Sequence, residues 1–301
     1  MRHDLLTEAQ NPASNEIDAL PTLEMLRVIN AADHAVATAV ERELPRIAAA
    51  VDGIVQRLQN GGRLFYLGAG TSGRLGVLDA SECPPTFNTP PELVQGIIAG
   101  GDGALRCSVE RAEDDPEQGR QDLETRGFNG RDALVGIAAS GRTPYVLGAI
   151  RYARSLGALA IGLSCTPKSE VAQAAQIAIT PLPGPEVITG STRMRAGTAT
   201  KLVLNMISTG VMIRMGYVYG NLMVNVQPTN EKLTDRARRI ISRIEGVSYD
   251  EASKLLAEAG SVRTAVLMHR LKLTRGEAES RLAAAKGRLR AALDAAAAGE
   301  Q

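Results

Sequence analysis

The chain has 301 residues, of which 44% are hydrophobic, and its 34 basic and 33 acidic side chains leave a net charge of +1. This length is enough for one large domain or for a domain with a smaller second one, and no apolar run is long enough to cross a membrane. A nucleic-acid partner is not expected, because no basic stretch stands out and aromatic residues make up only 3% of the chain.

The chain begins with a segment, residues 1–20, that is predicted to be an extended arm. It lacks the apolar core of a signal peptide, which favours a cytoplasmic protein. Residues 22–62 carry apolar side chains at helical spacing and are predicted to be helical. Asp33 is a candidate N-cap, Pro45 divides or kinks the region, and the pair Gly61-Gly62 ends it.

Short apolar runs then alternate with helical patterns. The runs predict strands at 64–67, 94–99, 133–138, 158–163 and 177–180, with helices at 73–81, 103–113, 143–156, 169–176 and after 191. This alternation is typical of an α/β fold with a doubly wound, parallel, five-stranded sheet flanked by helices. Ligands of such sheets bind beyond the carboxyl ends of the strands.

The last part of the chain has a different character, with many alanines and charges and no strand-like run after Asn230. It predicts a small domain with helices at 234–244, 248–259, 261–271 and 274–297. The sequence is therefore divided into an N-terminal arm with helices (1–53), an α/β domain (54–230) and a C-terminal helical domain (231–301).

The three cysteines are too widely spaced for a disulfide framework or a metal site. Cys107 and Cys165 are expected to be buried thiols, and Cys83 is expected to lie near a site because it follows Glu82 in sequence. A reducing compartment fits this cysteine usage.

The first candidate site segment is GAGTSGRLG, residues 68–76, which follows the first strand and opens a helix. Gly70 lets the backbone approach a ligand closely, and Thr71 and Ser72 add hydroxyl donors, so the turn is suited to an anion at a helix N-terminus. The same glycines fit a dinucleotide motif, but that motif expects an acidic residue at the end of the second strand, and Asp102 lies late for it.

The second segment is ASGRTP, residues 139–144, after the third strand. Ser140 and Thr143 supply hydroxyls, Gly141 a close backbone approach and Arg142 a charge. Each loop taken alone could be ordinary turn and cap chemistry. Two such loops on neighbouring strands fit one phosphate held from both sides better than they fit a dinucleotide.

The third segment, residues 184–201, reads GPEVITGSTRMRAGTATK and gathers polar groups at the start of an apolar helix. They are Glu186, Ser191, Thr192, Arg193 and Arg195. A well-capped, solvated helix start explains part of this pattern, but it does not require so many hydroxyl, glycine and arginine residues together.

Two carboxylates, Glu82 and Glu113, complete the candidate site. Glu82 closes the helix of the first loop, which Pro84 and Pro85 are expected to end, and Glu113 is expected at the end of the helix after the second strand. Two carboxyl groups in different protonation states can act as general acid and general base. A solvated acidic surface is the alternative for the residues around Glu113.

These segments resemble the motifs of the N-acetylmuramic acid 6-phosphate etherases, which carry GAGTSGRLG, ASECPP, AASGRTP and GPEVITGSTRMRAGTATK in this order. The last motif is also similar to one in the glucokinase regulatory protein. The resemblance covers nearly the whole chain. It implies a sugar isomerase (SIS) fold, a C-terminal domain like ubiquitin-associated (UBA) domains, and a homodimer that needs no metal or redox cofactor.

The family converts N-acetylmuramate 6-phosphate and water into N-acetylglucosamine 6-phosphate and D-lactate. By position, the resemblance implies that Glu82 is the acid that protonates the departing lactate and that Glu113 is the base. The predicted substrate-binding and phosphate-binding residues are Gly70, Thr71, Ser72, Ser140, Gly141, Arg142, Thr143, Glu186, Ser191 and Arg193. Glu186 matches a catalytic glutamate of SIS isomerases and is given a substrate-contact or structural role.

Two alternatives stay open from the sequence. A phosphosugar isomerase on the same fold would use one base, for which Glu186 is the candidate. A sugar-phosphate-sensing regulator like the glucokinase regulatory protein would bind without catalysis, although that protein is longer and has a second SIS domain.

Overall fold

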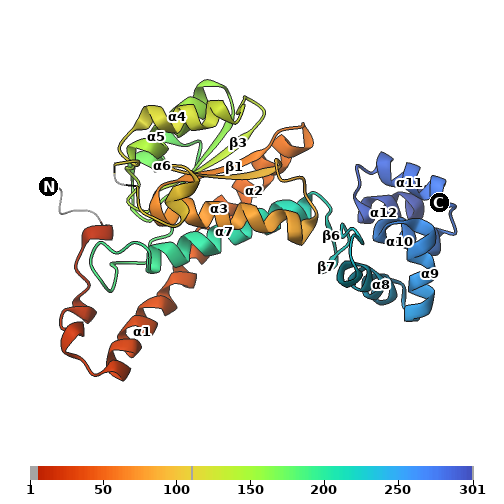
Figure 1. Cartoon of the computed structure of the whole chain (residues 1–301), viewed down its shortest axis with the longest axis horizontal. Helices are drawn as coiled ribbons and strands as arrows, with labels where there is room; N and C mark the ends of the chain where they lie inside the picture. The colour runs from red at the N-terminus through yellow and green to blue at the C-terminus, as the bar shows by residue number, and fades with distance from the viewer. Residues whose placement is uncertain (1–5, 110, 300–301) are drawn as a thin grey trace. The chain divides into compact units, whose positions relative to one another are not determined.

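A computed structural model of the chain describes residues 6–109 and 111–299 (Figure 1). Its contacts divide the chain into two compact units. The first comprises Met1–Glu82 and Pro90–Gly210, and the second comprises Cys83–Thr89 and Val211–Gln301. Each unit is described by itself below.

The first unit is built on a five-stranded sheet in which all strands are parallel. The strands are β1 (Leu64–Gly68), β2 (Val94–Ile98), β3 (Ala133–Ile137), β4 (Leu159–Leu163) and β5 (Ile177–Ile179), and they are arranged in the order β2-β1-β3-β4-β5. Every residue of β1, β3 and β4 is buried, as expected for a sheet covered on both faces. The predicted α/β fold and its five strands are confirmed.

Helices cover both faces of this sheet (Figure 1). One face carries α4 (Pro116–Thr125), α5 (Pro144–Ser155) and α6 (Glu170–Ala174), and the other carries α2 (Leu44–Gln59), α3 (Gly70–Phe87) and α7 (Arg195–Arg214). Side chains alternate along the strands, so Phe65 and Leu134 join the apolar core beneath α4 and α5 together with Val146 and Ile150. The strand ends are thereby held at fixed positions.

The N-terminal region differs over residues 6–20 from the extended arm that was expected, and residues 1–5 of that arm lie outside the described residues. Three short 3₁₀ helices, Leu6–Glu8, Pro12–Ser14 and Ile17–Ala19, precede α1 (Thr22–Glu41). Asp33 lies inside α1 and is not an N-cap, because Pro21 already starts the helix at Thr22. Pro45 does divide the region, since it occupies the first turn of α2, where its missing N–H costs nothing.

Two helix predictions around the site were wrong. In the described part of residues 103–113, which leaves out residue 110, no α-helix forms and the 3₁₀ turn Asp102–Leu105 overlaps its start. The helix α4 begins later, where Asp115 caps its first turn and Pro116 opens it. Glu113 therefore precedes a helix. The helix α3 also continues through the two prolines to Phe87, where the Asn88 N–H donates to the Pro84 carbonyl and completes the last turn.

In the residues that the structure describes, and besides the last residues of α3 and α7, the second unit contains a two-stranded hairpin and five helices of its own. They are β6 (Val218–Tyr219), β7 (Leu222–Met223), α8 (Glu231–Glu245), α9 (Tyr249–Ala259), α10 (Val262–Leu271), α11 (Arg275–Ala284) and α12 (Leu289–Gly299). Ile241, Leu256, Val266 and Leu293 belong to its shared apolar core. The single helix expected over 274–297 is two helices, because the chain turns at Lys286 and Gly287, both of which have positive φ. Within the described residues, no helix is long and apolar enough to span a membrane.

Candidate active site

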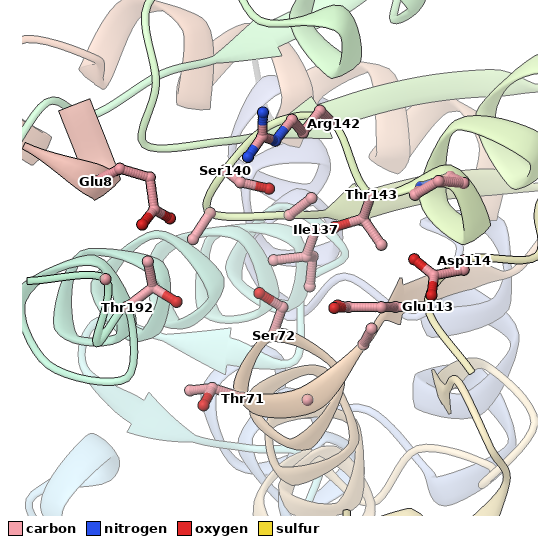
Figure 2. A pocket seen from close by; sticks show the side chains of 16 residues that line it. Glu8, Thr71, Ser72, Glu113, Asp114, Ile137, Ser140, Arg142, Thr143 and Thr192 are labelled. Atoms are coloured by element: carbon pink, nitrogen blue, oxygen red, sulfur yellow. The ribbon is translucent and has the colours of Figure 1, made fainter. Parts of the chain in front are cut away.

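A cavity of about 540 Å³ lies at the carboxyl edge of the sheet, where the segments after β1 and β3 meet (Figure 2). Its wall includes seven of the predicted site residues: Gly70, Thr71, Ser72, Glu113, Ser140, Arg142 and Thr143. Parallel strands end at the same edge, so loops that lie far apart in sequence converge there. The structure thus brings the first two predicted segments together with one of the two carboxylates.

The turn between β1 and α3 supplies the first wall of the cavity. The chain reverses so tightly that a Cβ on Gly73 would lie 2.5 Å from the Gly68 carbonyl oxygen, and Gly70 has φ +53. Both positions therefore require glycine. The first N–H groups of α3 have no partner inside the helix, and with the Thr71 and Ser72 side chains they offer donors to an anion.

The loop between β3 and α5 supplies the opposite wall. Gly141 is buried with φ +71, and an added Cβ would overlap the Ser169 side chain, so the loop can take this path only with glycine. Gly141 itself does not line the cavity, but it presents Ser140 and Arg142 on either side of it. Thr143 occupies the N-cap position of α5 without a side-chain cap bond, which leaves its hydroxyl for a ligand.

Glu113 points into this cavity beside Asp114 (Figure 2). Its backbone is held by α5, because the Tyr145 N–H in the first turn of that helix donates to the Glu113 carbonyl over 3.1 Å. The N-terminus of α5 thus serves two purposes: it faces the ligand space through Thr143, and it fixes the carboxylate that faces the same space. This places a candidate base next to a site for an anion.

The third predicted segment contributes one of its candidate polar residues, Thr192, but none of those predicted to bind the substrate. Gly190 and Thr192 line the cavity, whereas Ser191 and Arg193 do not. Glu186 lies away from the cavity wall and is 1% exposed. Its two carboxylate oxygens accept the backbone N–H groups of Arg195 and Ala196, each over 2.9 Å, so it caps the start of α7.

Glu8 also lines the cavity (Figure 2), although no sequence pattern predicted it there. Hydrogen bonds hold its segment against the loop before α7: Ser14 Oγ donates to the Val187 carbonyl over 2.8 Å, and Asn11 Nδ2 donates to the Pro185 carbonyl over 3.5 Å. These partners are more than 170 residues apart, so no local pattern could have indicated the contact.

Comparison with known proteins supports the resemblance of the motifs. Residues 46–154 match the family described as the glucokinase regulatory protein N-terminal SIS domain. N-acetylmuramic acid 6-phosphate etherases of Rhodopirellula baltica and Cronobacter sakazakii are 56% and 55% identical to this chain, over 89% and 96% of it and 89% and 98% of the relatives. That of Caldanaerobacter subterraneus is 57% identical over 88% of this chain and 87% of the relative.

This chain belongs to the N-acetylmuramic acid 6-phosphate etherase family. Membership in the etherase family accounts for the order of the loop motifs and confirms the resemblance inferred from them. It does not by itself assign a role to any side chain.

In this member of the etherase family, the two predicted catalytic carboxylates do not share one cavity. Glu82 is exposed on α3 and does not line the cavity that holds Glu113. Ten residues of α3 separate it from Ser72, which corresponds to about 15 Å along the helix axis.

The cysteines of this etherase-family chain were predicted only in part. Cys165 is buried as expected, and burial, with a smaller effect from the charge of Glu186, raises the pKa of its thiol to about 12. Cys83 is buried as well, but Cys107 is exposed because the helix expected around it does not form. In the part of the chain that the structure describes, no three His, Cys, Asp or Glu side chains gather to hold a metal ion.

Proposed function

We propose that this chain cleaves the D-lactyl ether of N-acetylmuramate 6-phosphate. The products are N-acetylglucosamine 6-phosphate and D-lactate, and the reaction serves the recycling of cell-wall muramic acid. The main support is that the Glu113 carboxylate lies beside a cradle of two anion-binding loops, residues 68–76 and 139–144. The chain that carries them is 55–57% identical to named etherases.

The cradle suits the phosphate end of such a substrate. The side chains of Ser72, Ser140, Thr143 and Arg142 line the same cavity, and the start of α3 forms part of its wall. A helix N-terminus and an arginine both favour a dianionic phosphate. Phosphate binding at this remote point orients the sugar and contributes binding energy to the step at C2 and C3.

The chemistry follows from the open-chain sugar, in which the C1 aldehyde acidifies the C2 proton. Glu113 as carboxylate removes that proton, and the resulting enolate breaks the C3–oxygen bond while Glu82 protonates the departing lactyl oxygen. Water then adds to C3, its proton passing to the Glu82 carboxylate, and a proton returns to C2. The reaction is a carbon–oxygen elimination followed by hydration, and each carboxyl contributes about a hundred- to ten-thousandfold.

We further propose that the working form is a cytoplasmic homodimer in which Glu82 of one chain serves the cavity of the other. The separation of Glu82 from Glu113 along α3 supports this arrangement. The helix α1 offers an apolar surface for a second copy, because Leu23 and Leu26 are 59% and 51% exposed and the buried residues of α1 lie only near its end. Exposed apolar side chains on one helix are typical of protein interfaces.

The isomerase alternative has less support. Its candidate base, Glu186, is buried away from the cavity, and both of its carboxylate oxygens are occupied by the start of α7. A base must lie within hydrogen-bond reach of the proton that it removes.

An NMR time course with N-acetylmuramate 6-phosphate in deuterated water tests the proposed function. We expect lactate release together with deuterium at C2 of the glucosamine product. The Glu113→Gln variant should lose both signals, and Glu82→Ala should retain C2 exchange but lose lactate release.

Exchange without lactate in the wild type would indicate an isomerase, and binding without either signal would indicate a regulator. Loss of both signals in Glu82→Ala would contradict the division of roles.

A further inference from the structure

A second cavity, of about 360 Å³, adjoins the first one and shares part of its wall. Ala69, Gly70 and Glu113 line both cavities. The Glu113 side chain therefore stands at the boundary between two spaces, and only the first of them has been used above for the phosphate end of the substrate.

The second cavity has a different chemistry from the first. Two arginines, Arg74 and Arg111, belong to its wall, and among the residues that the structure describes the acidic one there is the shared Glu113. Besides the shared Ala69, the wall contains four small apolar residues, which are Ala99, Ala104, Val109 and Ala112. Such a space combines positive charge with room for a methyl group.

The two arginines are in different situations. Arg74 is half-buried and builds the wall, because its Nε donates to the Leu105 carbonyl over 3.1 Å and its Nη2 to the Ala104 carbonyl over 2.7 Å. Arg111 is exposed and has φ +63. Its side chain makes no hydrogen bond or ion pair with any residue that the structure describes, so its guanidinium can bind a ligand.

We propose that this cavity binds the lactyl group of the ether, with Arg111 contacting the lactyl carboxylate. This inference rests on the proposed function. The lactyl group consists of a carboxylate and a methyl on one carbon, and it leaves the sugar at C3, next to the C2 proton that Glu113 removes. With the phosphate in the first cavity and C2 at Glu113, the C3 substituent extends across the boundary into the second cavity.

The positive charge of the wall favours the lactyl group on C3 over the other substituent near the reacting carbons, the N-acetyl group on C2. The N-acetyl group on C2 is neutral and would gain little from arginines. A carboxylate forms charge-assisted hydrogen bonds with a guanidinium, which are about twice as strong as neutral ones. The apolar residues of the same wall fit the lactyl methyl.

The test compares two ligands that differ only in the lactyl group. Calorimetry measures the affinities of N-acetylmuramate 6-phosphate and N-acetylglucosamine 6-phosphate for the full chain carrying Glu113→Gln, which prevents turnover. The same measurement is made after adding Arg111→Ala, or Arg106→Ala as the matched control. Arg106 is an exposed arginine of the same segment that lines neither cavity.

We expect Arg111→Ala to lower the affinity for the ether about ten- to hundredfold and to leave that for the glucosamine phosphate within about twofold. Arg106→Ala should change neither. An equal fall in affinity for both ligands would overturn the proposal, because it would show that Arg111 binds the phosphate or has a general structural role. No change in affinity for either ligand would also overturn it.

A separate assay of lactate release by the chain with Glu113 intact tests the proposed reaction independently of the proposed carboxylate site. If that protein releases no lactate but Arg111→Ala still removes the preference for the ether, the proposed reaction fails and the carboxylate site stands. If lactate is released and the preference persists in Arg111→Ala, the reaction stands and the carboxylate site fails.

Discussion

Asp79 is a carboxyl inside the first unit that the proposed chemistry does not use. It lies on α3, is 4% exposed and accepts a hydrogen bond from Ser208 Oγ on α7 over 3.2 Å. Burial raises its pKa above the ordinary value of 3.8, and hydrogen bonds together with the charge of Lys201 oppose this effect without cancelling it. The folded state therefore binds the Asp79 proton more tightly than the unfolded state does.

We predict that Asp79→Asn raises the free energy of unfolding at pH 7. With a folded-state pKa above 3.8, the contribution of Asp79 to stability is fully present below pH 3.8 and is lost as the pH rises through the folded-state pKa. Asparagine keeps the shape and the bond to Ser208 but carries no charge. Urea unfolding between pH 4 and pH 7 should show a gain that grows with pH.

The exposed Asp52 on α2 supplies the control, since Asp52→Asn also removes one carboxylate, but from the surface. The gain in stability at pH 7 should be larger for Asp79→Asn than for Asp52→Asn. A variant Asp79→Asn that is less stable than the wild type at pH 7 would show that the pairing with Lys201 outweighs the cost of burial.

A close contact between two helices positions the segment that carries Glu113. A Cβ on Gly148 of α5 would overlap the Pro116 carbonyl oxygen at the start of α4, and a Cβ on Gly119 of α4 would overlap the Tyr145 carbonyl oxygen. The two backbones can approach this closely only because both positions are glycine. Glu113 is three residues before Pro116, so its position depends on this packing.

We predict that Gly148→Ala costs about 1–3 kcal/mol of unfolding free energy, as overpacking does, and also lowers kcat. The added methyl pushes the start of α4 away and moves the Glu113 carboxylate from the cavity. Denaturant unfolding and initial rates of lactate release measure the two effects.

Gly276→Ala is the matched control because Gly276 also lies in a helix but has open space around its Cα. It should be neutral or slightly stabilising and should leave kcat unchanged. If Gly148→Ala resembles it in both measurements, the helix contact does not position Glu113.

At the scale of the whole molecule, mixing variant subunits tests whether one active site takes Glu82 and Glu113 from different chains. Glu82→Ala and Glu113→Ala homodimers should each be nearly inactive. In a purified heterodimer of the two variants, one cavity would combine an intact Glu113 with an intact Glu82 from the other chain. We predict that this heterodimer recovers about half of the wild-type rate of lactate release, because general acid and base would both be present at one of its two sites.

Two differently tagged chains, expressed together and purified through both tags, provide the heterodimer. A heterodimer of the wild type with the double variant is the matched control, and it should show little activity if each site takes one carboxylate from each chain. Full separation of the tags, or a mixed dimer without activity beside an active control, would argue against sites shared between chains.

The sequence by itself determined the parallel sheet, its five strands and the nature of the two anion loops. These features depend on short-range patterns: buried strands read as apolar runs, and the turns at Gly70 and Gly141 need glycine for a positive φ. Homology to the etherase family is also a property of the sequence alone. The likeness of the C-terminal helices to ubiquitin-associated domains and the domain limits drawn from composition stay predictions.

Only the tertiary structure decided which of the candidate residues meet. Glu186 and Glu113 are both glutamates in motif-rich segments, but one caps α7 and the other faces the cavity, because the loops around them are held by partners far away in sequence. The segment that carries Glu8 is held at the cavity by hydrogen bonds from Asn11 and Ser14 to residues beyond 180. Glu82 lies away from the cavity because of the length of α3. Long-range contacts of this kind leave no periodic pattern in a single sequence, which is why packing had to place these side chains.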